Sequence, residues 1–243
     1  MMHTTAIITG ASRGIGKACA LKMAEHFDNI VINSCHNKDA LHNVKKEIEE
    51  KGKNCLAFVG DIGDYDFVKS MISETIQEYK RINLLINNAG ISYVGLLTDM
   101  TIDDWNKLIQ TNLTSVFNCC NLTVPHMVKE KSGHIINISS MWGLNGASCE
   151  VAYSASKGGV NAFTQALAKE LAPSNISVNA IACGAVDTEM NSCFSKEELN
   201  VLCNDIPIGR LATPKEIADT VYLIYNSPAY LTGEIIKIDG GYM

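Results

Sequence analysis

Tyr153, Lys157 and Ser140 have the residue types and the spacing needed to protonate a carbonyl oxygen. Tyr153 and Lys157 stand four positions apart, so on a helix their side chains share one face. Ser140 ends an apolar run a short way upstream, where a strand is predicted to end. A carbonyl oxygen gains negative charge when a hydride arrives at its carbon, so a proton donor must lie against it. The three side chains therefore predict a site for carbonyl reduction, with Tyr153 as the acid.

Lys157 is expected to change the acidity of Tyr153. A free tyrosine has a pKa of about 10 and is a poor acid at neutral pH. We expect the Lys157 ammonium and the positive end of the helix dipole to lower the pKa of Tyr153, and a shift to about 7 needs roughly 4 kcal/mol. Ser140 would orient the substrate oxygen, and Lys157 would also hold a nicotinamide ribose. Each residue alone also has an ordinary structural interpretation, so the inference depends on their combination.

A glycine-rich segment near the start of the chain could bind a dinucleotide. The apolar run 6–9 is followed by Gly10, Gly14 and Gly16, and a helical pattern begins at once. Glycines in this position let the backbone turn tightly, approach a pyrophosphate and open a helix whose N–H groups face the anion. The spacing is G-x-x-x-G-x-G rather than G-x-G-x-x-G, and the alternative is an ordinary strand-to-helix turn.

The residues after the second apolar run, 30–33, bear on the choice of cofactor. No acidic residue lies between this run and Asp39. A carboxylate in this region would bind the adenosine ribose and select NAD. Arg13, in the glycine-rich segment, could instead pair with a 2′-phosphate, which favours NADP(H) over NAD(H); the alternative is a solvated loop charge. Asp61 could bind the adenine amino group or cap the helix that follows.

Alternating elements are predicted to position these residues. Short apolar runs indicate seven buried strands, at 6–9, 30–33, 55–59, 84–87, 133–138, 177–182 and 235–238. Segments with helical spacing lie between them, at 17–26, 41–51, 66–79, 102–129, 153–172 and 214–225. Asp64 and Thr101 are candidate N-caps. The pattern predicts one α/β domain over 1–243, a Rossmann fold with a doubly wound, seven-stranded parallel sheet and helices on both faces.

Composition narrows the function classes. The net charge of -6 argues against nucleic acid as a partner. No basic segment leads into an apolar core at the start of the chain, and no apolar run approaches the roughly 18 residues of a membrane span, so we expect no signal peptide, no membrane span and a cytoplasmic protein. The nine cysteines form no C-x-x-C pair and the six histidines show no ligand spacing, so free thiols and no metal site are expected.

The chain resembles the short-chain dehydrogenase/reductase family over essentially its whole length. The motifs are T-G-x-x-x-G-I-G at 9–16, N-N-A-G at 87–90 and Y-x-x-x-K at 153–157. The resemblance implies that Asn112 is a fourth catalytic residue, holding a water that links Lys157 to a proton relay; a helix-bending role is the alternative. The cofactor contacts that it implies fall on Gly10, Ser12, Arg13, Gly14, Ile15, Gly16, Ser34, Asp61, Ile62, Asn88, Tyr153, Lys157, Val186 and Thr188.

Within the family, the segments 207–211 and 231–233 are most similar to those of 3-oxoacyl-[acyl-carrier-protein] reductases. This implies NADPH-dependent reduction of a 3-oxoacyl thioester, with acyl carrier protein as a possible partner. It also implies a homotetramer that pairs through the helices at 102–129 and 153–172 and the last strand, which a stable monomer in light scattering would contradict. A substrate lid is expected at about 186–205.

Several departures keep further substrates and functions open. Lys131 is basic where such reductases dock an acidic carrier, but Ser174 is not, and Cys183 stands where a proline is usual. The segment 141–150 is similar to that of a bacterial subgroup that reduces a 5-aminopentanone group on modified elongation factor P. Glu150 could then pair with a substrate amine, or could simply interact with the helix dipole. The sequence is also compatible with a steroid or small-molecule ketone as substrate, with a nucleotide-sugar epimerase or dehydratase, and with an NADP(H)-sensing regulator without turnover.

Overall fold

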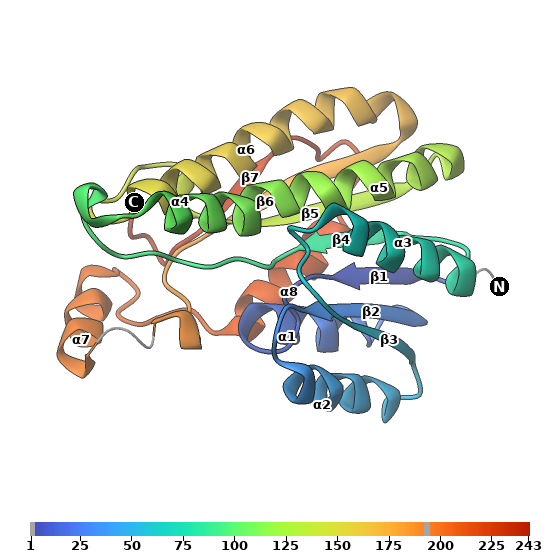
Figure 1. Ribbon diagram of the computed structural model, residues 1–243, viewed down its shortest axis with the longest axis horizontal. Helices are drawn as coiled ribbons and strands as arrows, with labels where there is room; N and C mark the ends of the chain where they lie inside the picture. Colours follow the sequence, from blue (N-terminus) through green and yellow to red (C-terminus); the bar gives the residue numbers. More distant parts are fainter. Residues whose placement is uncertain (1–2, 192–194) are drawn as a thin grey trace.

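Seven parallel strands form the centre of the protein in the order β3-β2-β1-β4-β5-β6-β7. We describe the computed structural model over residues 3–191 and 195–243 (Figure 1). The sheet confirms the predicted doubly wound Rossmann fold in a single domain. The strands are β1 (Thr5–Ile8), β2 (Asn29–Ser34), β3 (Asn54–Val59), β4 (Leu84–Asn87), β5 (Gly133–Ser140), β6 (Ile176–Cys183) and β7 (Ile235–Ile238).

The strand order reverses between β1 and β4, which are adjacent in the sheet and pair in parallel from Ala6 with Leu84 to Ile8 with Ile86. The chain first builds outward from β1 to β3 and then returns to β4 on the other side. In open parallel sheets, the crevice outside the carboxyl ends of the strands at such a reversal is where ligands bind. Two of the predicted functional segments, the glycine-rich turn after β1 and N-N-A-G at the end of β4, border this crevice.

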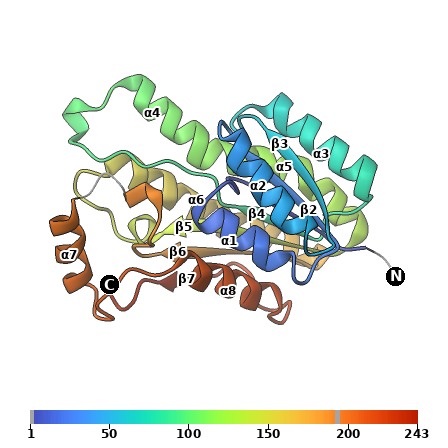
Figure 2. The ribbon, with the colours of Figure 1, turned by 90° about the horizontal axis from the view of Figure 1, so that it is seen from below.

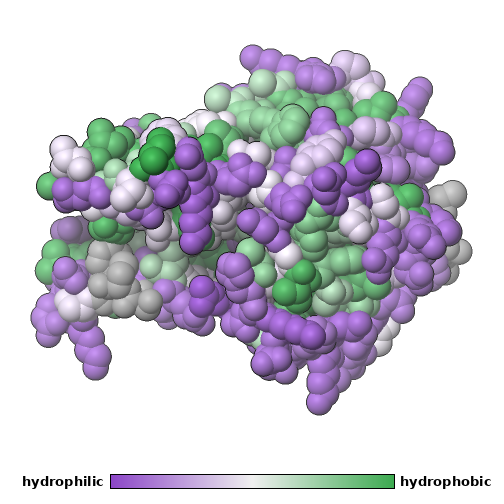
Figure 3. Space-filling view, viewed as in Figure 1, coloured by the Kyte–Doolittle hydropathy of each residue, from purple (hydrophilic) through white to green (hydrophobic). Residues whose placement is uncertain are grey.

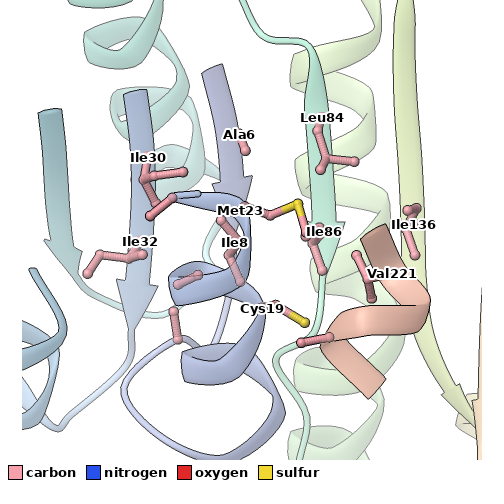
Figure 4. Close-up of a cluster of buried hydrophobic side chains, with 14 of the residues drawn as sticks. Ala6, Ile8, Cys19, Met23, Ile30, Ile32, Leu84, Ile86, Ile136 and Val221 are labelled. Atoms are coloured by element: carbon pink, nitrogen blue, oxygen red, sulfur yellow. The ribbon is translucent and has the colours of Figure 1, made fainter. Parts of the chain in front are cut away.

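Two apolar layers hold helices against the two faces of the sheet. On one face lie α1 (Gly14–Met23), α2 (Lys38–Glu49) and α8 (Pro214–Tyr225), and Figure 4 shows Cys19, Met23 and Val221 packed over strand residues such as Ile8 and Ile86. On the other face lie α3 (Tyr65–Tyr79), α5 (Ser115–Glu130) and α6 (Val151–Leu171), as Figures 1 and 2 show. Burial of apolar side chains in both layers supplies the main favourable free energy of folding.

The prediction of one continuous helix over 102–129 is wrong. The segment divides into α4 (Ile102–Ile109), a π-helical turn η2 (Gln110–Thr114) and α5. Asn112, within the turn, is buried and makes side-chain hydrogen bonds outside its own helix, which stabilise the extra residue of the π-helical turn. Single π-helical turns inserted in α-helices are frequent at functional sites. The π-helical turn at Asn112 therefore agrees with the helix-bending interpretation of this residue.

Helix ends follow the expected chemistry at the two candidate caps. Asp64 accepts hydrogen bonds from the backbone N–H groups of Asp66 and Phe67 at the start of α3, and Thr101 forms a capping box with Asp104 at the start of α4. One helix, α7 (Lys196–Asp205), was not predicted; Ser195 and Glu198 form its capping box. This helix lies in the segment expected to form a lid, of which residues 192–194 are outside the described residues.

The described cysteines are free thiols, and Cys193 lies outside the described residues. Across 3–191 and 195–243, no helix combines the length and the apolar character needed to cross a membrane. The same residues contain no group of three His, Cys, Asp or Glu side chains placed to hold a metal ion.

Candidate active site

A cavity of ≈ 1020 Å³ opens at the carboxyl ends of the strands. In Figure 3 the surface is hollowed between the part that carries α4 and the part that carries α7. The cavity lining includes every predicted cofactor-binding residue and three of the four predicted catalytic residues, Ser140, Tyr153 and Lys157. The fourth, Asn112, is buried behind the wall. The structure therefore brings together residues that are far apart in the sequence.

The glycine-rich turn is shaped to receive a pyrophosphate. Gly10 has a φ of +64°, a conformation that favours glycine, and a Cβ on Gly16 would lie 2.2 Å from the Gly10 carbonyl oxygen. The N-cap position of α1 is Arg13, whose side chain makes no capping hydrogen bond, so the first N–H groups of the helix remain available to an anion. These features fit the pyrophosphate of a dinucleotide.

Asn88 holds the turn against β4. Its side-chain Nδ2 donates to the carbonyl oxygens of Thr9 at 2.9 Å and Gly10 at 3.1 Å. In return, Thr9 Oγ1 accepts from the backbone N–H groups of Asn88 at 3.0 Å and Ala89 at 3.1 Å. Asn88 therefore positions the glycine-rich turn from the neighbouring strand, and it also lines the cavity.

The end of β2 contains no carboxylate that could receive a ribose. Ser34 Oγ donates to Ser12 Oγ at 3.2 Å, and Asn37 accepts from Ala40 N as the cap of α2. Asp61 lines the cavity but accepts from Gly63 N at 2.8 Å, in a turn that precedes the cap of α3. The helix is capped by Asp64 and not by Asp61, so the carboxylate of Asp61 braces a turn beside the cavity.

Arg13 is engaged in a contact that the sequence did not indicate. Its guanidinium forms an ion pair with Glu189, which begins the short helix η5 (Glu189–Asn191). Both side chains are more than half exposed, at 61% and 64%, so the pair is screened by solvent and contributes little to stability. Thr188 lies over Gly14 in the same region. The ion pair joins the glycine-rich turn to the beginning of the expected lid.

Ser140, Tyr153 and Lys157 meet where β5 ends and α6 begins. Lys157 is buried, and its Nζ donates to the carbonyl oxygen of Ile138 at 2.8 Å. The same Nζ lies 5.8 Å from the centre of the Tyr153 ring, a cation–π contact. Ser140 Oγ accepts from Trp142 N at 3.1 Å. The tyrosine and lysine thus share a helix face, as their spacing predicted.

The electrostatics differ from the expectation. Burial raises the pKa of Tyr153, against an opposing effect of its hydrogen bond with Ser140. Burial also lowers the pKa of Lys157 to about 8, because the ammonium has little solvent around it. The prediction that Lys157 lowers the pKa of Tyr153 is therefore wrong for this arrangement: the ammonium faces the Ile138 carbonyl and the face of the ring. The pKa of the Cys183 thiol, which also lines the cavity, is raised by burial to about 12.

Asn112 organises the wall behind Lys157. Its Oδ1 accepts from Ile91 N at 2.8 Å, and its Nδ2 donates to Ile91 O at 2.9 Å and to Ser156 Oγ at 3.1 Å. A Cβ built on Gly90 would lie 3.3 Å from Asn112 Oδ1 and 3.5 Å from Lys157 Nζ, so the two side chains flank the same glycine. The side-chain amide is engaged with protein groups, so the water-holding role of Asn112 stays a prediction.

Besides the Arg13–Glu189 ion pair, two further contributions to the site were missed from the sequence. The Ile138 carbonyl that anchors Lys157 is a backbone group, and residue type gives no signal for it. Trp142 belongs to the segment 141–150 that the resemblance singled out, but its backbone hydrogen bond to Ser140 depends on the short helix η3 (Met141–Gly143), which apolar periodicity does not reveal.

Comparison with known proteins places this geometry in a family. The family model described as short chain dehydrogenase matches residues 4–199. The 3-oxoacyl-[acyl-carrier-protein] reductase FabG of Staphylococcus aureus is 38% identical over 241 residues, 99% of this chain and 98% of that protein. The FabG of Chlamydia muridarum is 37% identical over 243 residues, with the same coverage. The uncharacterized oxidoreductase YmfI of Bacillus subtilis is 39% identical over 243 residues, 99% of each chain. The chain therefore belongs to the short-chain dehydrogenase family, as an oxidoreductase that acts on CH–OH and C=O groups with a nicotinamide cofactor.

Proposed function

We propose that the protein reduces a ketone to a secondary alcohol with NADPH, and that the ketone is a 3-oxoacyl thioester borne by a carrier such as acyl carrier protein. The observation that carries the proposal is the convergence of Ser140, Tyr153 and Lys157 with the glycine-rich turn on one cavity. Two relatives of nearly full length with the printed name 3-oxoacyl-[acyl-carrier-protein] reductase support the choice of substrate. We also propose a homotetramer through α4, α5, α6 and β7 and a lid at about 186–205.

Each residue of the set has a distinct task in this reaction. Bound NADPH supplies the hydride. Ser140 donates a hydrogen bond that orients the substrate oxygen, and Tyr153 gives its proton to that oxygen as charge develops. Burial raises the pKa of Tyr153, so the phenol is protonated at neutral pH, and the developing alkoxide is the stronger base that takes its proton. Lys157, with a pKa of about 8, can exchange protons near neutral pH and restores the proton to Tyr153. Asn112 positions the wall beside it.

The absence of a carboxylate at the end of β2 and the exposure of Arg13 support NADP(H) as the cofactor. We expect Arg13→Gln to raise the KM for NADPH about tenfold, which corresponds to roughly 1.4 kcal/mol, while the KM for NADH changes little. Initial rates at varied cofactor concentration measure both constants. Arg210→Gln is the matched control, since Arg210 is also an exposed arginine paired with a glutamate. An unchanged NADPH preference in Arg13→Gln would contradict the assignment of the 2′-phosphate.

A second substrate is favoured by one observation. Glu150 lines the cavity, and burial raises the pKa of its carboxyl, against an opposing hydrogen bond with Trp142. Within the described residues it forms no ion pair, so a cationic group of a substrate could neutralise it. An amino-ketone, such as the 5-aminopentanone group on elongation factor P, would fit this carboxylate.

A substrate panel separates the two candidates. We expect NADPH oxidation, measured by absorbance, to be faster with an acetoacetyl thioester than with a small amino-ketone or a steroid ketone. Glu150→Gln should leave the kcat/KM for the thioester within about twofold of the parent value. If the amino-ketone is the substrate, the order of rates is reversed and Glu150→Gln lowers its kcat/KM about tenfold or more, since a desolvated ion pair is lost. That result would replace the thioester proposal. No turnover of any member of the panel would contradict both.

A further inference from the structure

The residues that follow β7 form a built turn rather than a loose end. Asp239 accepts from Gly241 N through Oδ1 and from Met243 N through Oδ2, both at 3.0 Å. Its side chain is only 5% exposed and is paired with Lys237 at 3.3 Å. Gly240 and Gly241 have φ values of +68° and +86°, which let the backbone reverse. We name residues 239–243 the terminal turn.

The terminal turn contacts two segments of the chain, the residues that follow α7 and those that follow β5. On one side, Ile208 N donates to Gly240 O at 3.2 Å, directly after α7 (Figure 2 shows the end of the chain beside this helix). On the other side, the Tyr242 ring meets the Trp142 indole edge to face, with ring centres 5.9 Å apart and planes at 81°. The Asn145 side chain donates to Met243 Sδ at 3.1 Å. The turn therefore contacts both the base of α7 and the segment after β5.

Trp142 connects the terminal turn to the reacting centre. Its backbone N–H donates to Ser140 Oγ at 3.1 Å, its side chain hydrogen-bonds Glu150, and the residue lines the cavity. The base of this segment is held independently of the turn, because Asn161 Nδ2 donates to Gly143 O at 2.9 Å. The Asn161 contact does not fix the orientation of the indole, which depends on the hydrogen bond with Glu150 and on the Tyr242 ring that lies against it.

We infer that Tyr242 is a positioning residue for the substrate side of the cavity: its ring holds the Trp142 indole, and through it the Glu150 carboxylate. Tyr242 does not line the cavity itself, so it acts through Trp142. Edge-to-face aromatic pairs have a preferred geometry, which gives the indole one orientation. The kinetic consequence rests on the proposed reduction at this site, whereas the orientation of the indole does not.

The sequence offers a clean optical test, because Trp142 is one of only two tryptophans and the other is Trp105. In a Trp105→Phe background, all indole emission comes from Trp142. Tyr242→Ala removes the ring, Tyr242→Phe keeps it, and Tyr230→Ala serves as the matched control since Tyr230 is 100% exposed. We expect Tyr242→Ala to shift the Trp142 emission to longer wavelength and to increase its quenching by acrylamide. Tyr242→Phe and Tyr230→Ala should leave both unchanged.

Steady-state kinetics measure whether Tyr242 affects the KM for the ketone or the KM for NADPH. We expect Tyr242→Ala to raise the KM for the ketone about fivefold or more and to leave the KM for NADPH unchanged, since only the substrate side of the cavity is affected. Tyr242→Phe, which keeps the ring, should have both KM values close to those of the parent. An unchanged Trp142 emission in Tyr242→Ala would overturn the inference. So would an equal rise in the KM values for ketone and NADPH together with a lower melting temperature, the signature of general destabilisation. Absence of turnover in the parent enzyme would count against the proposed substrate, while the emission data would still decide the role of Tyr242.

Discussion

Tyr153→Phe is expected to lower kcat at least a hundredfold, which is about 2.7 kcal/mol of transition-state stabilisation. The variant keeps the ring that lies over Lys157 and loses only the hydroxyl that gives its proton to the substrate oxygen. The dissociation constant for NADPH should stay within about twofold, because the phosphate-binding turn is untouched. Turnover is measured by NADPH absorbance, and binding by the fluorescence of the reduced cofactor.

Tyr225→Phe provides the comparison for this result. Tyr225 is partly buried on α8, where its ring packs against Phe27, and it is remote from the cavity lining. It should retain parental kcat. Near-normal turnover in Tyr153→Phe would remove Tyr153 from the role of acid, and with it the proposed mechanism. A hundredfold loss of NADPH affinity would show instead that the phenol holds the cofactor.

Gly16→Ala is expected to weaken NADPH binding at least a hundredfold, roughly 2.7 kcal/mol. A methyl group there would lie 2.2 Å from the Gly10 carbonyl oxygen and 2.5 Å from Asn88 Nδ2. Neither group can move freely, since Asn88 is bonded to Thr9 O and Gly10 O across the sheet. The turn must therefore open or distort, at the place where the pyrophosphate would bind. Overpacking of this kind typically costs about 1–3 kcal/mol of stability as well.

The matched control is Gly146→Ala, because a Cβ on Gly146 has no heavy atom within 4 Å. Gly146 lies between the cavity-lining residues Trp142 and Glu150 in the sequence, but a methyl group there meets open space, so both the NADPH dissociation constant and the melting temperature should be unchanged. Titration of each folded variant, with its melting curve, separates weaker binding from unfolding. Parental affinity in Gly16→Ala would mean that the cofactor does not approach this turn.

The fold could be predicted from the sequence because its strands are short, apolar and buried on both sides. All seven strands were located with ends within two residues of those in the structure, as the pair Ala6–Thr9 and Thr5–Ile8 illustrates. The interruption at Gln110–Thr114 could not be predicted, because the apolar spacing continues through it. The turn depends on hydrogen bonds from Asn112 to Ile91 and Ser156, which are distant in sequence.

The candidate site, like the fold, could be predicted from the sequence only in part. Residue types and spacing located Ser140, Tyr153 and Lys157 and the glycines of the turn, since their chemistry depends on local order. The direction of the pKa shift of Tyr153 depends on burial and on where the ammonium points, neither of which spacing gives. The ion pair of Arg13 with Glu189 joins residues 176 positions apart, and no local pattern announces it.

The hydrogen bonds between Thr9 and Asn88 have a consequence for how the protein acquires its activity. They join residues 79 positions apart in the chain, across the boundary where the strand order reverses. Contacts of such long sequence separation form late, because closing the intervening loop costs conformational entropy before the favourable free energy of the contact is gained. A nascent chain that has completed β1, β2 and β3 holds the glycines but lacks the amide that braces them. We therefore expect cofactor affinity to be acquired only after β4 has been synthesised and has docked beside β1.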